Sequence, residues 1–155
     1  DWHRRLSRFA PDSWVSHVNR TASVEPVRCD EETWTLLRDA VAVWAASGGA
    51  FDVTRGAGEW LRLNDVARTV AFERPGMSLD LGGIGKGHAI DCAIRCLRDC
   101  GVTSAFLHGG TSSGYGLGLD ADGRHWRVRV DNEVLHLRDL AYSVSDAAGQ
   151  TTPHI

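Results

Sequence analysis

The chain has 155 residues, a formal net charge of −3, and a composition that is 43% hydrophobic and 24% charged. These values are typical of one globular domain with an ordinary core. The weak negative charge gives no reason to expect a nucleic-acid partner, and no apolar run approaches the length of a membrane span. We expect a single domain over residues 1–155 that is incomplete at both ends.

The N-terminal part carries the pattern of two short helices. Trp2, Leu6 and Phe9 are spaced for one helical face, and Pro11 ends that pattern. Ser13 then stands where an N-cap belongs, directly before a second amphipathic stretch. We therefore predict one short helix before Pro11 and another after Ser13.

A longer helix is predicted over residues 31–47. Asp30 precedes it as an N-cap, glutamates occupy its first turn, and Gly48 ends it. Its apolar positions follow three- and four-residue steps: Trp34, Leu37, Val41 and Trp44. Residues 51–54 follow as extended chain or loop.

Strand patterns come after the long helix. Residues 68–72 alternate as a strand does, and a Pro-Gly turn leads into a second apolar strand at residues 77–81. A glycine-rich turn over residues 82–87 follows, and then a helix to about residue 99.

The last third of the chain has short strand patterns joined by small-residue loops. We predict strands over residues 104–108 and 125–130, and a last strand from residue 134 toward residue 145. A loop at 109–114 and a hairpin turn at 120–123 separate them. Helices first and strands later predict an α+β fold, with helices packed on a largely antiparallel sheet.

Three of the four cysteines form a stripe on one predicted helix. Cys92, Cys96 and Cys100 recur at four-residue steps, whereas Cys29 stands apart. The stripe is either a set of small buried residues beside the apolar face or a metal cluster, although no C-x-x-C pair is present. We favour the buried interpretation because free cysteine is among the most buried residue types.

The most informative motif spans residues 79–91, with an apolar strand, a glycine-rich turn and a helix. Glycines let a ligand approach the backbone, and a helix N-terminus offers free amides and the positive end of its dipole. The stretch matches neither a Walker A loop nor the dinucleotide pattern G-x-G-x-x-G. We predict a phosphate site held by Lys86 and the amides of residues 85–88. Asp80 either points into this site or caps the turn through its carboxylate.

Two more polar clusters accompany the motif. A second small-residue loop, residues 109–114, follows a predicted strand at the end where ligand sites often gather. A third cluster closes the chain: Ser143, Ser145, Asp146, Gln150, Thr151 and His154. Together the three clusters predict a pocket for phosphate and ribose with a titratable group beside it.

Several segments resemble one family. Residues 79–91 resemble the core L-D-L-G-G-I-x-K-G-x-A-x-D of the ApbE family, the FAD:protein FMN transferases, and residues 51–54 resemble its F-D-x-T segment. Residues 6–19 resemble its L-S-x-F…S…N stretch, and residues 142–155 resemble its T-S-G…H-I-x-D-P end. The resemblance covers nearly the whole chain, and residues 79–91 are its specific part.

The resemblance implies a Mg2+-dependent transfer of FMN from FAD to a Thr or Ser hydroxyl of an acceptor protein, with release of AMP. It implies that FAD is held by Asp80, Gly82, Gly83, Lys86, Gly109, Gly110, Thr111, Ser143 and Ser145. The carbonyl of Gly85 is the candidate metal ligand, and His154 is the candidate base for the hydroxyl proton. Family members include exported, lipid-anchored proteins and cytoplasmic ones, so the resemblance leaves localisation open.

The chain departs from the family pattern at Thr111, where Asp is usual, and at Asp146, where some relatives have Gly. The family's later metal ligands would follow Ile155, so we expect little transferase activity from residues 1–155 alone. Two alternatives to the transferase therefore stay open: a non-catalytic FAD-binding protein of the same fold, and a divergent partner-binding domain that has lost nucleotide binding.

Overall fold

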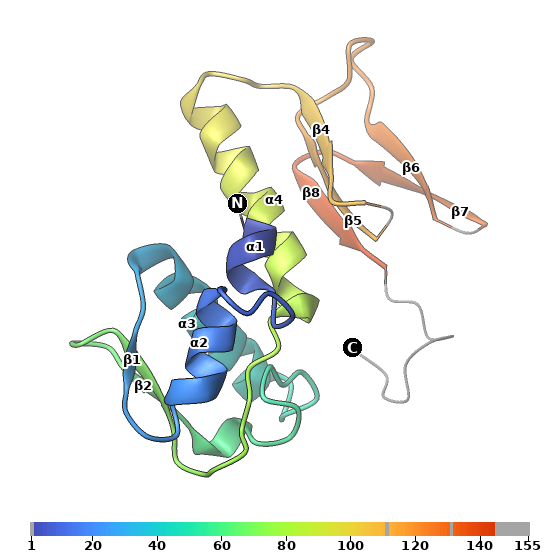
Figure 1. Cartoon of the computed structure of the whole chain (residues 1–155). Coiled ribbons are helices and arrows are strands. Elements are labelled where there is room, and N and C mark those ends of the chain that lie inside the picture. The colour runs from blue at the N-terminus through green and yellow to red at the C-terminus, as the bar shows by residue number, and fades with distance from the viewer. Residues whose placement is uncertain (1, 111, 131, 145–155) are drawn as a thin grey trace. The chain divides into compact units, whose positions relative to one another are not determined.

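The computed structural model describes residues 2–110, 112–130 and 132–144 (Figure 1). The described residues fall into two compact units that meet in the chain between Gly85 and Lys86. Both units contain antiparallel strands, and the helices α1 to α4 accompany them, which confirms the predicted α+β class. The single domain over residues 1–155 stays a prediction.

Unit 1 begins with three helices: α1 (Trp2–Leu6), α2 (Trp14–Thr21) and α3 (Glu31–Ala46). Both predicted caps are present. The Ser13 hydroxyl accepts a hydrogen bond from the Ser16 amide at 2.9 Å. The Asp30 carboxylate accepts one from the Thr33 amide at 2.9 Å. Each cap satisfies an amide that the first helical turn leaves without a partner.

Phe9 does not belong to the buried face that we predicted for the first helix. Leu6 is buried, but α1 ends there and Phe9 is 79% exposed. The Arg8 guanidinium lies over the Phe9 ring, 4.4 Å from its centroid. The prediction was wrong because it assumed that the helix continues to Phe9, whereas α1 ends at Leu6.

The sheet of unit 1 has three antiparallel strands in the order β1-β3-β2: β1 (Val27–Arg28), β2 (Leu61–Asn64) and β3 (Thr69–Phe72). A single 3-10 turn, η1 (Gly58–Trp60), leads into β2. Fully buried side chains from the helices, β3 and the segment before α4 form the core: Val15, Val18, Leu36, Leu37, Val70, Leu79 and Leu81.

The strand predicted over residues 77–81 does not form. Instead, the Asn19 side chain forms hydrogen bonds with both backbone groups of Leu79. Its Oδ1 accepts from the Leu79 amide at 2.6 Å, and its Nδ2 donates to the Leu79 carbonyl at 3.1 Å. The next amide, that of Asp80, donates to the Val53 carbonyl at 2.7 Å. The apolar pattern correctly indicated a buried segment. Its backbone hydrogen bonds, however, are made with the Asn19 side chain and the Val53 carbonyl and not with a neighbouring strand.

Helix α4 (Gly82–Asp99) runs through the boundary between the units. Unit 2 then has a three-stranded antiparallel sheet in the order β4-β5-β8: β4 (Ala105–His108), β5 (Ser113–Leu117) and β8 (Leu140–Ser143). A two-stranded hairpin completes it: β6 (Trp126–Val130) and β7 (Glu133–Leu137). Ile90 and Ile94 of α4 form a small core with Leu117 of β5.

Two strands of unit 2 differ from the predictions. Residues 113–117 are strand β5, although we predicted only a loop ending at residue 114. The last predicted strand is two strands, β7 and β8, because Asp139 has a φ of +52° and breaks the extended backbone. The Asp139 carboxylate accepts from the Gly118 amide at 3.2 Å, which holds this turn against the end of β5.

The cysteines are free thiols in unlike surroundings. Cys29 is buried, and burial raises the pKa of its thiol to about 11. Cys92 is half-buried and its Sγ lies 3.5 Å from Nε2 of His88. Cys96 and Cys100 are exposed. The buried interpretation of the stripe is therefore wrong for Cys96 and for Cys100, and Cys100 lies just beyond the end of α4.

Among the residues that the structure describes, no helix combines the length and the apolar character needed to cross a bilayer.

Candidate functional site

The glycine-rich stretch is the beginning of a helix and not a turn before one. Helix α4 starts at Gly82, and the Gly85 amide already donates to the Leu81 carbonyl at 2.8 Å. From residue 86 onward each helical amide donates to the carbonyl four residues earlier. The amides of residues 85–88, which we predicted to hold the anion, are therefore occupied, and the terminal amides lie at residues 82 and 83.

The glycines differ in how closely they are packed at this helix start, and Gly85 is the tightest of them. A Cβ on Gly85 would lie 3.2 Å from Cδ1 of Leu6, and one on Gly83 would lie 3.5 Å from the Phe51 ring. Gly83 is exposed, so its backbone remains accessible to a ligand. Glycine permits both properties because it has no side chain to cover its own backbone.

Asp80 caps this helix start, which is one of its two predicted roles. Its carboxylate accepts from the Gly82 amide at 3.0 Å. The same carboxylate pairs with the guanidinium of Arg55 at 2.6 Å and with that of Arg8 at 3.2 Å. Since these contacts occupy the carboxylate, a direct contact between Asp80 and FAD stays a prediction. The two arginines bring positive charge close to the N-terminus of α4.

Asp52 organises the loop that resembles the F-D-x-T segment. Its Oδ1 accepts from the amide and the hydroxyl of Thr54 at 2.7 and 2.6 Å. Its Oδ2 accepts from the amides of Gly56 and Gly58 at 2.9 and 3.1 Å. Burial raises the pKa of the Asp52 carboxyl. The hydrogen bonds together lower the pKa by more than burial raises it, so the pKa lies below its usual value. Sequence reasoning did not assign Asp52 a role.

Replacing Asp52 with asparagine is expected to lower the free energy of unfolding by about 1–3 kcal/mol at neutral pH, because an amide nitrogen would face two backbone donors. The folded pKa is depressed, so the carboxylate stabilises the protein above its unfolded pKa, and that stabilisation is lost as the pH falls through the folded pKa. The difference between wild type and Asp52→Asn should therefore shrink below about pH 4. Thermal melts across pH test this, with the exposed Asp65→Asn as control; equal effects of the two changes would contradict it.

The second candidate region lies in unit 2, around Lys86. The Lys86 ammonium donates to the Ser112 hydroxyl at 2.6 Å, so the first turns of α4 and the loop between β4 and β5 lie together. The Ser112 carbonyl accepts from the Val144 amide at 2.7 Å, just beyond β8. Ser143 pairs with Ser113 in the sheet. Lys86, Ser112 and Ser143 therefore gather at one end of the β4-β5-β8 sheet.

Lys86 is the only lysine in a chain that holds 17 lysine and arginine residues. Lysine provides a compact charge with three N–H donors, whereas arginine provides a planar fork. The ammonium is exposed, and Ser112 uses one of its donors. No other described residue accepts from it, which leaves donors for a phosphate oxygen.

Of the remaining predicted site residues, the structure describes some and not others. Gly109 packs closely on α4, because a Cβ there would lie 3.3 Å from Cδ1 of Ile90. Gly110 has a φ of +79°, which glycine adopts without strain. Three predicted residues lie outside the described part of the chain: Thr111, Ser145 and His154. Ser112 belongs to the loop that we predicted to line the pocket, but the sequence did not single it out, because nothing there separates it from its small neighbours.

A magnesium site is not assembled by the described residues. Among residues 2–110, 112–130 and 132–144, no group of three or more His, Cys, Asp or Glu side chains is placed to hold a metal ion. Gly85 lies inside α4, where its carbonyl is a regular helix acceptor. The proposed metal ligand Gly85 therefore stays a prediction, and the described donor set does not fit a magnesium ion without further ligands.

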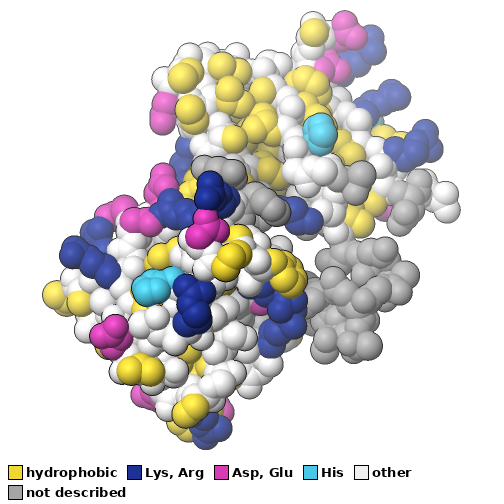
Figure 2. All heavy atoms as spheres, in the orientation of Figure 1, with side chains coloured by type: hydrophobic (Ala, Val, Ile, Leu, Met, Phe, Trp, Pro, Cys, Tyr) yellow, Lys and Arg dark blue, Asp and Glu magenta, His cyan; other side chains and the backbone are white. Residues whose placement is uncertain are grey.

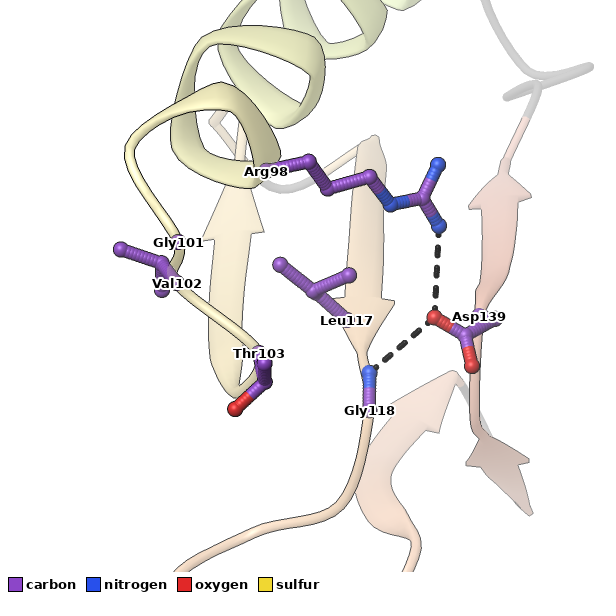
Figure 3. Close-up of a pocket in the computed structure, with 7 residues that line it drawn as sticks. All are labelled: Arg98, Gly101, Val102, Thr103, Leu117, Gly118 and Asp139. Carbon is purple, nitrogen blue, oxygen red and sulfur yellow. Dashed lines mark hydrogen bonds and ion pairs between the residues drawn. The ribbon is translucent and has the colours of Figure 1, made fainter.

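A pocket of about 300 Å³ lies at the other end of α4 (Figure 3). Leu117 and Val102 line it beside the ion pair that joins Arg98 and Asp139 at 3.3 Å. It contains none of the predicted site residues. The candidate region around Lys86 is instead an exposed surface at the opposite end of the helix.

The fold and this region define an α+β protein with a lysine-bearing helix start next to a small-residue loop, an arrangement suited to a phosphate-bearing ligand. The ApbE family model matches residues 1–58 and 58–150. The chain belongs to the ApbE family.

Similar proteins agree with this assignment. The chain is 23% identical over 164 residues to an FAD:protein FMN transferase of Vibrio cholerae serotype O1, and the match covers 88% of this chain and 49% of the relative. The chain thus spans about half the length of that curated relative.

Solved structures show the same fold. The ApbE protein of Thermotoga maritima superposes with a TM-score of 0.78 at 23% identity, over 88% of this chain and 56% of that one. The flavin transferase ApbE of Vibrio cholerae superposes with a TM-score of 0.80 at 21% identity, over 99% of this chain and 62% of that one.

Proposed function

We propose that this chain belongs to a flavin transferase that moves FMN from FAD onto a Thr or Ser hydroxyl of an acceptor protein, releases AMP and requires Mg2+. Membership in the ApbE family and similarity to an FAD:protein FMN transferase support the proposal. The contact between Lys86 and Ser112 is the observation that carries it, because it joins the family motif to the second small-residue loop.

Lys86 would hold oxygens of the FAD pyrophosphate. Transfer of this type depends on charge neutralisation and positioning more than on covalent catalysis. The Lys86 ammonium is exposed and already positioned by Ser112, so it reaches a bound anion with little loss of side-chain freedom. Gly110 and Ser143, also exposed, would flank the ligand.

The reaction balances as a phosphoryl-type transfer. The acceptor hydroxyl oxygen forms a bond to the FMN phosphorus, and the bond from that phosphorus to the bridging oxygen of AMP breaks. AMP leaves with that oxygen, and the hydroxyl proton passes to a base. His154 remains our proposal for this base because imidazole has a suitable unperturbed pKa. A bound Mg2+ would supply charge neutralisation at the phosphates.

The test uses the full-length protein with FAD, Mg2+ and a candidate acceptor protein that contains an accessible Thr or Ser. Mass spectrometry should detect an acceptor heavier by one FMN phosphoester, and chromatography should detect AMP. Calorimetry on the same sample measures FAD binding separately. FAD binding without product would favour the non-catalytic flavin-binding alternative. No FAD binding would overturn both the transferase and the flavin-binding hypotheses and favour the partner-binding domain.

A further inference from the structure

The β6–β7 hairpin has two unlike faces. One face carries the more buried side chains, among them Trp126, Val128 and Leu137. Trp126 and Leu137 pack on Gly116 of β5, where a Cβ would collide with both. The opposite side carries exposed residues that the strand register brings together. We call these residues the cationic face: Arg127, Arg129, Val134 and His136.

The two arginines of this face are unlike some other cations of unit 2 in their contacts with described residues. In the part of the chain that the structure describes, neither Arg127 nor Arg129 forms an ion pair or a side-chain hydrogen bond. Nearby cations differ, because Arg98 pairs with Asp139 at 3.3 Å and Arg124 with Asp122 at 3.7 Å. Figure 2 shows dark-blue side chains over the part of the view that β6 and β7 occupy in Figure 1.

This concentration of positive charge contrasts with the net charge of −3 of the chain. Charge on an edge strand also discourages edge-to-edge aggregation, which gives Arg127 and Arg129 a purely protective explanation. That explanation does not account for Val134, which is 43% exposed on the same face and directly opposite Arg129. An apolar side chain between cations suits a protein partner better than a nucleic-acid backbone.

The second edge of β6 is unpaired in the part of the chain that the structure describes. Among the described strands, β6 pairs with β7 alone, so the other side of its backbone has no strand partner. Extended peptides bind such edges through main-chain hydrogen bonds, and neighbouring side chains provide selectivity. Residues two apart on a strand lie about 6.6–6.8 Å apart on the same face. Carboxylates two apart on an added strand would therefore match the spacing of Arg127 and Arg129.

We propose that the cationic face and the β6 edge bind an acidic segment of a partner protein in extended conformation. The arginines select carboxylates at alternate positions, and the β6 backbone holds the segment. This inference goes beyond flavin transfer, because it rests on the hairpin and not on the region around Lys86.

The probe is a fluorescein-labelled ten-residue peptide with Glu and Thr in alternation, and fluorescence anisotropy with the whole chain measures its affinity at low and physiological salt. The double variant Arg127→Gln/Arg129→Gln should bind about fivefold to tenfold more weakly. Arg28→Gln is the matched control, because Arg28 is also exposed on a strand and has no ion pair in the described part. It should bind as tightly as the wild type.

Three further outcomes decide the proposal. A peptide with Gln in place of Glu should bind weakly, and a peptide with Pro in place of alternate Thr should also bind weakly because it lacks amides for pairing. No binding of the Glu peptide, or equal losses in the double variant and in Arg28→Gln, would overturn the proposal. Tighter binding of a single-stranded oligonucleotide than of the Glu peptide would assign the face to nucleic acid instead. Unchanged thermal melts of both variants exclude misfolding as the cause.

Discussion

Lys86→Met should weaken FAD binding by about tenfold to a hundredfold, because a hydrogen bond to a charged group is worth about 1.5–3 kcal/mol. Methionine retains the length and apolar stem of lysine but has no donor. The exposed ammonium has no ion-pair partner among the described residues, so its removal breaks only the contact with Ser112 inside the protein. Thermal stability should therefore change little while affinity falls. Isothermal titration calorimetry with FAD measures the effect.

Two variants separate the Lys86 contact from a general effect of charge. Lys86→Arg retains the charge in another geometry and should recover part of the affinity. Arg28→Met removes one exposed cation from strand β1 and should leave FAD affinity unchanged. If Lys86→Met and Arg28→Met bound FAD equally well, Lys86 would face solvent in the complex and the phosphate role would be wrong.

Since Lys86 is the only lysine of the chain, a chemical measurement can support the mutational one. An amine-reactive acylating reagent should modify Lys86 in the free protein, and bound FAD should slow that modification. Acylation that proceeds at the same rate with and without saturating FAD would contradict a direct contact.

Gly118→Ala should destabilise unit 2 by about 2–5 kcal/mol, because it adds a methyl group where neither the backbone conformation nor the space permits one. Gly118 has a φ of +58°, and a Cβ there would collide with the Thr103 carbonyl oxygen. The left-handed backbone costs an L-residue about 1–2 kcal/mol, and overpacking adds about 1–3 kcal/mol. The Gly118 amide also donates to Asp139, so a shift of the backbone would disturb the turn between β7 and β8.

Gly123→Ala is the matched control for this prediction. Gly123 has a φ of +74° in the turn before β6, but a Cβ there would meet nothing within 4 Å. This variant should lose only about 1–2 kcal/mol, the backbone cost alone. Urea unfolding followed by tryptophan fluorescence measures both variants. Equal losses would show that the backbone near Thr103 yields without cost, and the predicted steric contribution would then be wrong.

Local signals in the sequence were sufficient for much of unit 1. Ser13 and Asp30 cap α2 and α3 as predicted, because a side-chain cap needs only an amide three residues away. The alternation at residues 68–72 correctly predicted a strand, observed as β3 over Thr69–Phe72. The motif around Lys86 correctly predicted a helix that ends near residue 99, although α4 already begins at Gly82 and not after the glycines. These features are determined by residues that lie close together in the sequence.

The features that sequence reasoning missed depend on partners distant in the chain. Residues 77–81 are extended without a sheet because Asn19, 60 residues away, binds the backbone of Leu79. The glycines at 82–85 also lie in the first turn of α4, where Leu6, 79 residues away, packs tightly on Gly85: a Cβ there would lie 3.2 Å from Cδ1 of Leu6.

For the candidate site the sequence specified the residue types, namely one lysine, glycines and small hydroxyl side chains. Only the folded chain placed them. Asp80 is held by Arg8 and Arg55, and Lys86 is held by Ser112, contacts that join elements 25 to 72 positions apart in the numbering. Such pairings are decided by which surfaces pack against one another, and a pattern of neighbouring residues carries no information about that packing.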